Sequence, residues 1–391
     1  MKKEIYFDNA STTKISGEVL NAMMPLLSEC YGNSNSVHAM GRRANKYLDE
    51  SRDQIAKTLN VKPTEIYFTS GGTEANNWAI IGLAMANRRK GNHIITSKIE
   101  HHSVLDACKQ LEANGFRVTY LDVDQYGFIN FADLLGSICA DTILISIMSA
   151  NNEIGTIQNI KAISEIVKFY GACFHVDGVQ ALGVMPINVN DLGIDLLSIS
   201  AHKIHGPKGA GALYIRKGVK IDKFMIGGEQ EMNRRGGTVN VPAVVGFGKA
   251  CELNNRDMAF RDKKLFEISQ YFIKKIEYEV PDIIINGNQN QKVNNIVSVT
   301  FLGIEGEYLV TLLDMKGIAV STGSACASGS FQKSHVLKAM GRTDQEVRGT
   351  IRFSFDVSTT KEDVDYVVRT LCEEVEKLRK DSPVKYKKKD S

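Results

Sequence analysis

The 391-residue sequence lacks the features that mark secreted, membrane-spanning and strongly charged proteins. An acid and a strand-like run occupy residues 1–8, where a signal peptide needs a long apolar core. The longest apolar stretch, residues 78–86, is far shorter than the roughly 20 residues that a bilayer span needs. Forty-eight Lys and Arg against 45 Asp and Glu give a formal net charge of only +3, which offers no general attraction to nucleic acid or anionic lipid. We therefore expect a cytoplasmic protein with no direct nucleic acid or membrane partner.

Paired cysteines and metal-binding patterns are also missing. The seven cysteines are scattered, odd in number, and include no Cys-x-x-Cys pair. A disulfide framework or a zinc cage is therefore not expected, and no metal site is predicted. The glycine-rich stretch at residues 69–74 matches neither the nucleoside triphosphate motif nor the dinucleotide motif.

Short β-branched runs alternate with amphipathic segments over the first 250 residues, a pattern that predicts an α/β sheet with helical crossovers. After about residue 256 the composition changes to a charged helix over 258–278, a turn region, further strands and a last helix over 361–380. This change predicts a second, smaller α+β domain. The expected strands of the first part are residues 65–70, 93–97, 117–121, 142–148, 173–176, 196–200 and 211–215.

One strand runs into Ser70, two glycines and Thr73 before an apolar-periodic helix. Such a turn directs backbone N–H groups at an anion, and the Thr73 hydroxyl can bind the same oxygens. The alternative is an ordinary connection between a strand and a helix.

Three polar residues follow predicted strands, at the sheet edge where open α/β sheets bind ligands. Lys203 could serve there as a Schiff-base nucleophile, or it could be an ordinary surface lysine. Asp177 could pair with a protonated ring nitrogen of a flat cofactor, or it could cap the next segment. His101 could stack on such a ring, although a lone histidine is more often structural.

Cys326 is surrounded by Gly, Ala and Ser, a composition that predicts an accessible loop and a reactive thiol. The alternative is a small buried hydrophobe. Alternation over residues 346–354 predicts a strand with Arg348 and Arg352 on one face. Either guanidinium could hold a substrate carboxylate, or form a surface ion pair.

Taken together, the motifs resemble those of cysteine desulfurases of the NifS/IscS type, which are class V aminotransferases with the fold-type I architecture of enzymes that use pyridoxal 5'-phosphate. They occur in the family's order and cover nearly the whole chain. The matching segments are 6–13 (YFDNASTT), 69–74 (TSGGTE), 100–101 (EH), 151–155 (NNEIG), 176–180 (VDGVQ), 200–203 (SAHK), 235–238 (RGGT) and 323–326 (GSAC).

The resemblance implies a large domain with a mainly parallel central sheet flanked by helices, and a smaller α+β carboxyl-terminal domain. We expect residues 1–13 to form an N-terminal segment that packs with the small domain. Residues 14–257 would form the large domain that binds pyridoxal phosphate, and residues 258–391 the small domain that carries the Cys326 loop.

The same resemblance assigns three catalytic residues. Lys203 would hold the cofactor covalently and move the Cα proton of the substrate, His101 would stack on the ring and assist proton transfer, and Cys326 would attack the sulfur. The substrate carboxylate would bind Arg352 and Asn33.

The remaining cofactor contacts implied by the resemblance involve the ring and the phosphate. Asp177 would contact the ring nitrogen, and Asn152 and Gln180 its phenolic oxygen. The phosphate would be bound by Gly72, Thr73, Ser200, His202 and, from the second subunit of a homodimer, Thr238.

The implied reaction converts L-cysteine to L-alanine and leaves a persulfide on Cys326. A sulfur-acceptor protein, either a scaffold for iron–sulfur cluster assembly or a tRNA-thiolation protein, would take the sulfur, and Cys326 would contact an iron–sulfur cluster only transiently. A selenocysteine lyase, another fold-type I enzyme such as an aminotransferase, and a catalytically idle binding platform remain alternatives. Ser34, Asn35 and Asp356 depart from the family pattern, which weakens the prediction for Asn33 and for the surface that meets acceptors.

Overall fold

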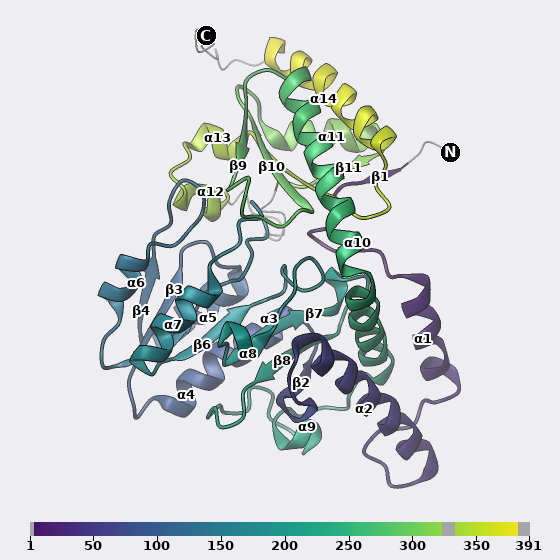
Figure 1. Cartoon of the computed structure of the whole chain (residues 1–391), viewed down its shortest axis with the longest axis vertical. Helices are drawn as coiled ribbons and strands as arrows, with labels where there is room; N and C mark the ends of the chain where they lie inside the picture. Colours follow the sequence, from purple (N-terminus) through teal and green to yellow (C-terminus); the bar gives the residue numbers. More distant parts are fainter. Residues whose placement is uncertain (1–3, 323–332, 382–391) are drawn as a thin grey trace.

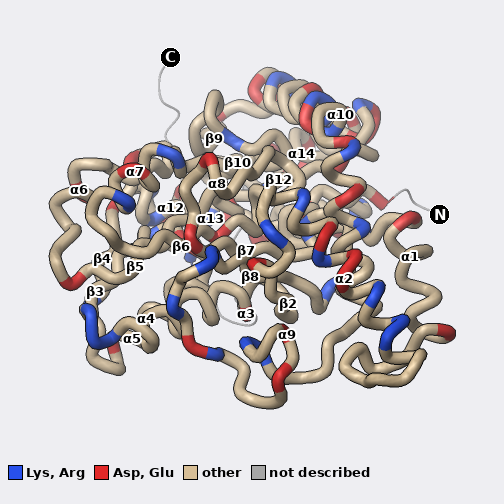
Figure 2. Tube along the Cα trace, turned by 60° about the horizontal axis from the view of Figure 1, so that its bottom comes forward, with Lys and Arg blue, Asp and Glu red and all other residues tan. Residues whose placement is uncertain are grey.

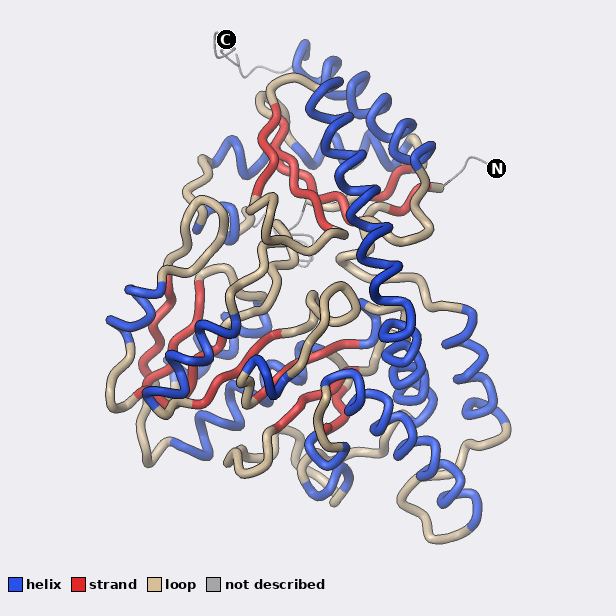
Figure 3. Tube along the Cα trace, viewed as in Figure 1, coloured by secondary structure: helices blue, strands red, loops and turns tan. Residues whose placement is uncertain are grey.

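The computed structural model describes residues 4–322 and 333–381, so that Cys326 lies outside the described residues. It contains one large mixed sheet and a smaller region built around a second sheet (Figures 1 and 3). The predicted fold class, a mainly parallel α/β sheet with a smaller α+β part, is confirmed.

The large sheet has seven strands in the order β2-β8-β7-β6-β5-β3-β4, and β8 alone runs antiparallel to its neighbours. The predicted strands correspond one to one with these seven, with small differences at their ends. Their bounds are β2 (Ile66–Thr69), β3 (His93–Ser97), β4 (Arg117–Leu121), β5 (Thr142–Ser146), β6 (Cys173–Asp177), β7 (Leu196–Ser200) and β8 (Gly211–Ile215).

Helices cover both faces of this sheet. Successive strand residues point to opposite sides, and here the residues on both sides are apolar and must be buried. Ile94 and Leu144 belong to a core that contains Trp78, whereas the next residue of each strand, Ile95 and Ile145, belongs to another core. This pattern explains why the strands read as continuous apolar runs. The first core involves α3 (Gly72–Asn77), a π-helical turn (Trp78–Gly82), α4 (Leu83–Asn87) and α5 (His102–Ala113); the second involves α2 (Ala39–Leu59), α7 (Ile160–Tyr170) and α8 (Val189–Leu192).

The smaller region packs an antiparallel sheet against helices, with a third core between them. Its sheet has the order β12-β10-β9, and a parallel pair, β1 with β11, lies beside it. The elements are β1 (Ile5–Tyr6), β9 (Ile283–Asn286), β10 (Ile296–Phe301), α11 (Gly306–Met315), β11 (Ile318–Ala319), α12 (His335–Ala339), α13 (Asp344–Arg348), β12 (Thr350–Ser354) and α14 (Lys361–Asp381).

One long helix, α10 (Val241–Glu279), connects the two regions (Figure 3). Phe247 in its first half packs in the large-sheet core, whereas Phe272 in its second half packs in the small-sheet core. The expected helix over 258–278 is the second half of α10, and the predicted domain boundary after residue 257 falls inside this helix. The remaining helices are α1 (Gly17–Ser28), α6 (Phe131–Ser137) and α9 (Gln230–Asn233), with 3₁₀ turns at Pro63–Glu65 and Ala201–Lys203.

The predicted strand over 346–354 is wrong in its first half. Thr343 and Glu346 form a capping box, in which each side chain bonds the backbone N–H of the other, and this starts α13. Arg348 therefore ends a helix, and its side chain is half exposed, 3.7 Å from Glu305. Only Arg352 lies on β12, so the two arginines do not share a strand face.

Acidic and basic residues are interspersed along the chain (Figure 2). Within residues 4–322 and 333–381, no helix is both long enough and apolar enough to cross a bilayer.

Candidate active site

A cavity of about 360 Å³ lies where β2, β3, β5, β6 and β7 end at the same edge of the large sheet. Parallel strands bring the residues that follow them to one place, which is why segments distant in sequence meet there. Among the predicted site residues, the lining includes Gly72, Thr73, His101, Asn152, Asp177, Gln180, Ser200, His202, Lys203 and Arg352.

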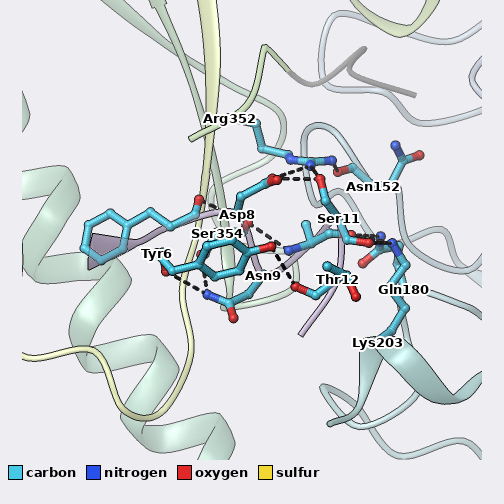
Figure 4. Close-up of polar contacts among 12 residues, drawn as sticks. Tyr6, Asp8, Asn9, Ser11, Thr12, Asn152, Gln180, Lys203, Arg352 and Ser354 are labelled. Atoms are coloured by element: carbon cyan, nitrogen blue, oxygen red, sulfur yellow. Dashed lines mark hydrogen bonds and ion pairs between the residues drawn. The ribbon is translucent and has the colours of Figure 1, made fainter. Parts of the chain in front are cut away.

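Lys203 ends the 3₁₀ turn after β7 and points at the N-terminal segment (Figure 4). Its Nζ donates to the carbonyl oxygens of Ala10 and Ser11, at 2.5 and 2.9 Å. Gln180 Nε2 donates to the same Ala10 oxygen at 3.0 Å. The N-terminal segment is therefore a wall of the cavity and fixes the position of the lysine amine.

A chain of hydrogen bonds links Asp177 to His101. Asn76 Nδ2 donates to Asp177 Oδ2 at 2.7 Å and to Ser103 Oγ at 2.9 Å. Ser103 Oγ in turn lies 2.8 Å from His101 Nδ1 and donates to the ring, because Nδ1 accepts from the Ser103 backbone N–H and therefore carries no proton. Asn76 is buried, so this amide sets the orientation of both groups.

His101 caps the N-terminus of α5, and this contact decides where the ring carries its proton. The backbone N–H of Ser103 donates to His101 Nδ1 at 3.1 Å, and a backbone N–H can only donate. Burial lowers the pKa of His101, and the nearby Asp177 opposes this effect without reversing it. The ring is thus neutral at pH 7, with its proton on Nε2.

The end of the cavity near β7 suits a multiply charged anion. The buried Ser200 hydroxyl has no hydrogen-bond partner among the described residues. A Cβ at position 72 would lie 2.7 Å from Val179, so glycine lets the start of α3 pack closely against the segment after β6, beside Ser200. Burial lowers the pKa of His202 to about 4, with Lys203 as a further cause, so His202 is a neutral hydrogen-bonding group.

Arg352 lies at the opposite side of the cavity, on β12, and is 3% exposed. Its Nη1 donates to the Asn152 carbonyl oxygen at 2.8 Å. Its Nη2 donates to Asp8 Oδ1 at 3.0 Å and to Ser11 Oγ at 2.7 Å (Figure 4). The guanidinium is therefore held in one orientation by one backbone carbonyl and two side chains, which come from two distant segments of the chain.

Comparison with known proteins identifies the family. The model of the class V aminotransferases matches residues 5–367 of the chain. A cysteine desulfurase IscS of Dictyoglomus turgidum is 50% identical over 385 residues, which cover 98% of each chain. This chain belongs to the cysteine desulfurase family of class V aminotransferases. A second IscS of that family, from Methanosarcina thermophila, is 50% identical over 382 residues, which cover 98% of this chain and 94% of the relative.

Solved structures show the same relationship at the level of the fold. A NifS-like protein superposes with a TM-score of 0.91 at 38% identity, covering 96% of this chain and all of the other. A structure of SspA in complex with cysteine superposes with a TM-score of 0.81 at 35% identity, covering 92% of this chain and all of the other. The resemblance to cysteine desulfurases that the motifs indicated is confirmed.

Two predicted site residues do not line this cavity in the single chain, Asn33 and Thr238. Asn33 lies between α1 and α2, where its Oδ1 accepts from the backbone N–H of Asn35 at 3.0 Å. Thr238 precedes α10. Their roles stay predictions, as does the role of Cys326, which lies outside the described residues.

Two buried acids near the cavity were not predicted. Glu100 accepts from Ser97 Oγ at 2.6 Å and from the Met148 backbone N–H at 3.0 Å, and burial raises its pKa to about 8. Burial also raises the pKa of Glu153, which accepts from Ser334 Oγ at 2.5 Å. Ser334 immediately precedes α12, so Glu153 holds the start of that helix beside the cavity.

Sequence reasoning also missed Asn76, Ser103, Asp8 and Ser11. Asn76 follows the glycine-rich stretch at residues 69–74 and lies in the predicted helix, where no pattern distinguishes it from an ordinary helical residue. Asp8 and Ser11 belong to a matching motif, but no spacing along the chain relates them to Arg352, some 340 residues later.

Proposed function

We propose that this chain removes the sulfur of L-cysteine, releases L-alanine and keeps the sulfur as a persulfide on Cys326 for transfer to an acceptor. The observation that carries the proposal is the meeting of Lys203, Asp177, His101 and Arg352 around one cavity, in a chain similar over its whole length to cysteine desulfurases. Lysine and arginine at opposite sides suit the amino and carboxylate groups of an amino acid.

Pyridoxal phosphate fits the residues present. The unpartnered Ser200 hydroxyl and the Gly72 backbone offer an anion contact, Asp177 is a buried carboxylate for a ring nitrogen, and Lys203 lines the same cavity. Thr73 and His202 complete the proposed phosphate contacts, and Asn152 and Gln180 those to the phenolic oxygen. When bound, this cofactor supplies an electron-withdrawing ring that stabilises negative charge at the substrate Cα.

The side chains of the cavity then have distinct tasks. Arg352 holds the α-carboxylate of L-cysteine, with Asn33 as a second proposed contact. Lys203 Nζ takes the Cα proton and returns one later. His101 lies over the reacting region with Nε2–H as a hydrogen-bond donor, because Nδ1 is occupied by Ser103.

Cys326 acts as the nucleophile in the sulfur transfer. Its thiolate forms a bond to the substrate sulfur while the Cβ–S bond of L-cysteine breaks, and the electron pair of the broken bond stays with Cβ. Cβ takes a proton to become the methyl group of L-alanine. Cys326 keeps the sulfur as a persulfide, which an iron–sulfur scaffold or a tRNA-thiolation protein then receives.

We also propose that two copies of the chain form a homodimer. Helix α1 exposes three large apolar residues, Leu20, Met24 and Leu27, at 42, 52 and 59%. Exposed apolar surface of this kind favours an interface, and a second copy of the chain is the proposed partner. Thr238 of the partner subunit would then complete the phosphate site.

The decisive experiment compares wild type with Cys326→Ala, both loaded with pyridoxal phosphate and given L-cysteine and a reductant. We expect the wild type to produce sulfide and L-alanine in equal amounts. Cys326→Ala should lose sulfide release while keeping the absorbance of the Lys203-bound cofactor, because the proposed cofactor contacts do not include the thiol. Cys139→Ala serves as the control, since that thiol lies at the amino-terminal side of β5.

Sulfide release by Cys326→Ala at the wild-type rate would contradict the persulfide mechanism and favour a lyase that acts directly, as a selenocysteine lyase could. Failure of the wild type to bind pyridoxal phosphate would favour the binding-platform alternative.

A further inference from the structure

The proposed carboxylate ligand, Arg352, already has a carboxylate partner within the chain. Its Nη2 lies 3.0 Å from Asp8 Oδ1, and the two side chains are 4 and 20% exposed. Ser11 Oγ joins the pair by donating to Asp8 Oδ1 at 2.7 Å and accepting from Arg352 Nη2 at 2.7 Å. Figure 4 shows this cluster at one side of the site, with Lys203 at the other.

The backbone around Asp8 is fixed, so its carboxylate is not free to leave the guanidinium through loop motion. Asp8 forms a parallel β-bridge with Ser354, two residues beyond Arg352 on the same strand. Asn9 is bonded to Ser354 through both its backbone N–H, at 3.3 Å, and its side chain Nδ2, at 3.0 Å. The Phe7 carbonyl oxygen accepts from the Ser354 backbone N–H at 2.8 Å.

A substrate carboxylate that reaches Arg352 therefore meets a cation that is already paired. Two carboxylates beside one guanidinium repel each other, and the repulsion is stronger in a partly buried site than in water. The Arg352 Nε is buried without a hydrogen-bond partner among the described residues, and Nη1 uses only one of its two N–H groups on Asn152. Because Nε is shielded from solvent, the second N–H of Nη1 is the donor available to a second carboxylate alongside Asp8.

We propose that Asp8 is the internal counter-ion of Arg352 and sets how tightly the site holds the α-carboxylate of an amino acid. The inference rests on the proposed function, in which Arg352 binds that carboxylate. L-cysteine and L-alanine carry the same carboxylate, so Asp8 weakens the binding of substrate and product alike. Asp8 thus acts through Arg352 to limit the affinity for amino-acid carboxylates and promotes release of the product.

The test is Asp8→Asn in the enzyme loaded with pyridoxal phosphate. The amide has nearly the same shape and its oxygen still accepts from Nη2, but the negative charge is gone. We expect the KM for L-cysteine and the inhibition constant for L-alanine to fall together by about tenfold, with no rise in kcat. Inhibition by ethylamine, which is alanine without its carboxylate, should not change.

Asp365→Asn is the matched control. Asp365 Oδ1 lies 2.7 Å from Lys275 Nζ, between α10 and α14 and away from the cavity lining. The Asp365→Asn substitution removes the same charge from another ion pair, and should leave the KM for L-cysteine and the inhibition constant for L-alanine as in the wild type. Thermal unfolding of each variant shows whether the fold is intact, and Asp8→Ser provides a second neutral variant expected to shift both constants in the same direction.

An unchanged or increased inhibition constant for L-alanine in a folded neutral variant would overturn the inference, because Asp8 would then only orient Arg352. A tenfold fall in the inhibition constant of ethylamine would also overturn the inference, since the effect of Asp8 would then not depend on the ligand's carboxylate. L-alanine affinity measured by calorimetry needs no turnover, so the inference can fail or hold independently of whether the wild type forms sulfide and alanine.

Discussion

At the scale of single residues, Asn76 connects two groups with different proposed tasks. Its Nδ2 donates hydrogen bonds to Asp177 and to the Ser103 hydroxyl, and that hydroxyl is in turn bonded to the ring of His101. The proposed ring-nitrogen partner and the hydroxyl that bonds the histidine ring therefore share one amide donor. Asn76 is a positioning residue, since its effect passes through these neighbours.

We expect Asn76→Ala to lower kcat for L-cysteine by about tenfold, because Asp177 and Ser103 each lose a buried hydrogen-bond donor. The absorbance of the bound cofactor should shift its pH dependence, an effect that loss of stability alone does not produce. Steady-state kinetics and absorbance spectra between pH 6 and 9 measure both effects.

Asn77→Ala is the control for this prediction. Within the described part of the chain, Asn77 Nδ2 donates to the Ser103 backbone carbonyl oxygen, at 2.8 Å, and not to Asp177 or to the Ser103 hydroxyl. Equal losses of kcat in both variants, with unshifted spectra, would show that the residues support the fold alone.

The site residues at the ends of strands could be predicted from the sequence, whereas the residues that hydrogen-bond to them could not. Lys203 and Asp177 follow apolar runs, and parallel strands bring such positions to one edge. Asn76 and Asp8 act through partners that are near only after folding, 101 and 344 residues away. No local pattern encodes those distances.

At the scale of elements, Asp356 joins the end of β12 to the loop after β7. Its Oδ1 lies 3.1 Å from His205 Nε2, and Arg261 of α10 lies 3.0 Å from the same nitrogen. Burial opposes ionisation, but the hydrogen bonds from His205 and Ser358 hold the pKa of Asp356 well below its ordinary value. This residue, which departs from the family pattern, therefore ties the small sheet to the active-site edge of the large one.

We expect Asp356→Asn to lower the free energy of unfolding at pH 7 by about 1 to 3 kcal/mol. A carboxylate whose pKa is lowered in the folded state contributes stability above its unfolded pKa of about 4 and loses that contribution as the pH falls toward the folded pKa. Urea unfolding of wild type and variant from pH 7 down to pH 3 should show the difference shrinking below about pH 4. A constant difference over that range would contradict the ionic contribution.

Element boundaries show where sequence patterns mislead. Short runs of apolar residues predicted all seven strands of the large sheet. Such runs mark these strands because helices cover both faces of the sheet. Arg348 was misplaced because alternation over so few residues cannot outweigh the helix start set by Thr343 and Glu346. The domain boundary predicted after residue 257 lies inside α10, because the first half of this helix is apolar and buried while much of the second half is charged.

At the scale of the whole molecule, α10 makes the two cores share one element. Phe272 has no exposed surface and its ring centroid lies 4.8 and 5.3 Å from those of Phe353 and Phe355 in the small-sheet core. The single tryptophan, Trp78, lies in a core of the large sheet. The fluorescence of Trp78 therefore reports on the large-sheet part of the molecule, whereas Phe272 packs in the small-sheet core.

We expect Phe272→Ala to cost about 3 to 5 kcal/mol and to shift the unfolding midpoint of both Trp78 fluorescence and circular dichroism. The shared helix transmits the loss from one core to the other. Phe260→Ala, at an exposed position of α10, should leave both midpoints nearly unchanged. An early circular dichroism step with an unshifted Trp78 midpoint would show that the two cores unfold separately.

The contact of Asn9 with Ser354 also has a consequence for the order of events during biosynthesis. These residues are 345 positions apart, and the Ala10 backbone N–H, in the wall of the cavity, also donates to Ser354 Oγ at 2.8 Å. The large sheet can form while the ribosome is still translating, but this wall cannot take its place until β12 has left the exit tunnel. Catalytic competence is therefore a late property of the nascent chain, acquired only after most of its polypeptide has been made.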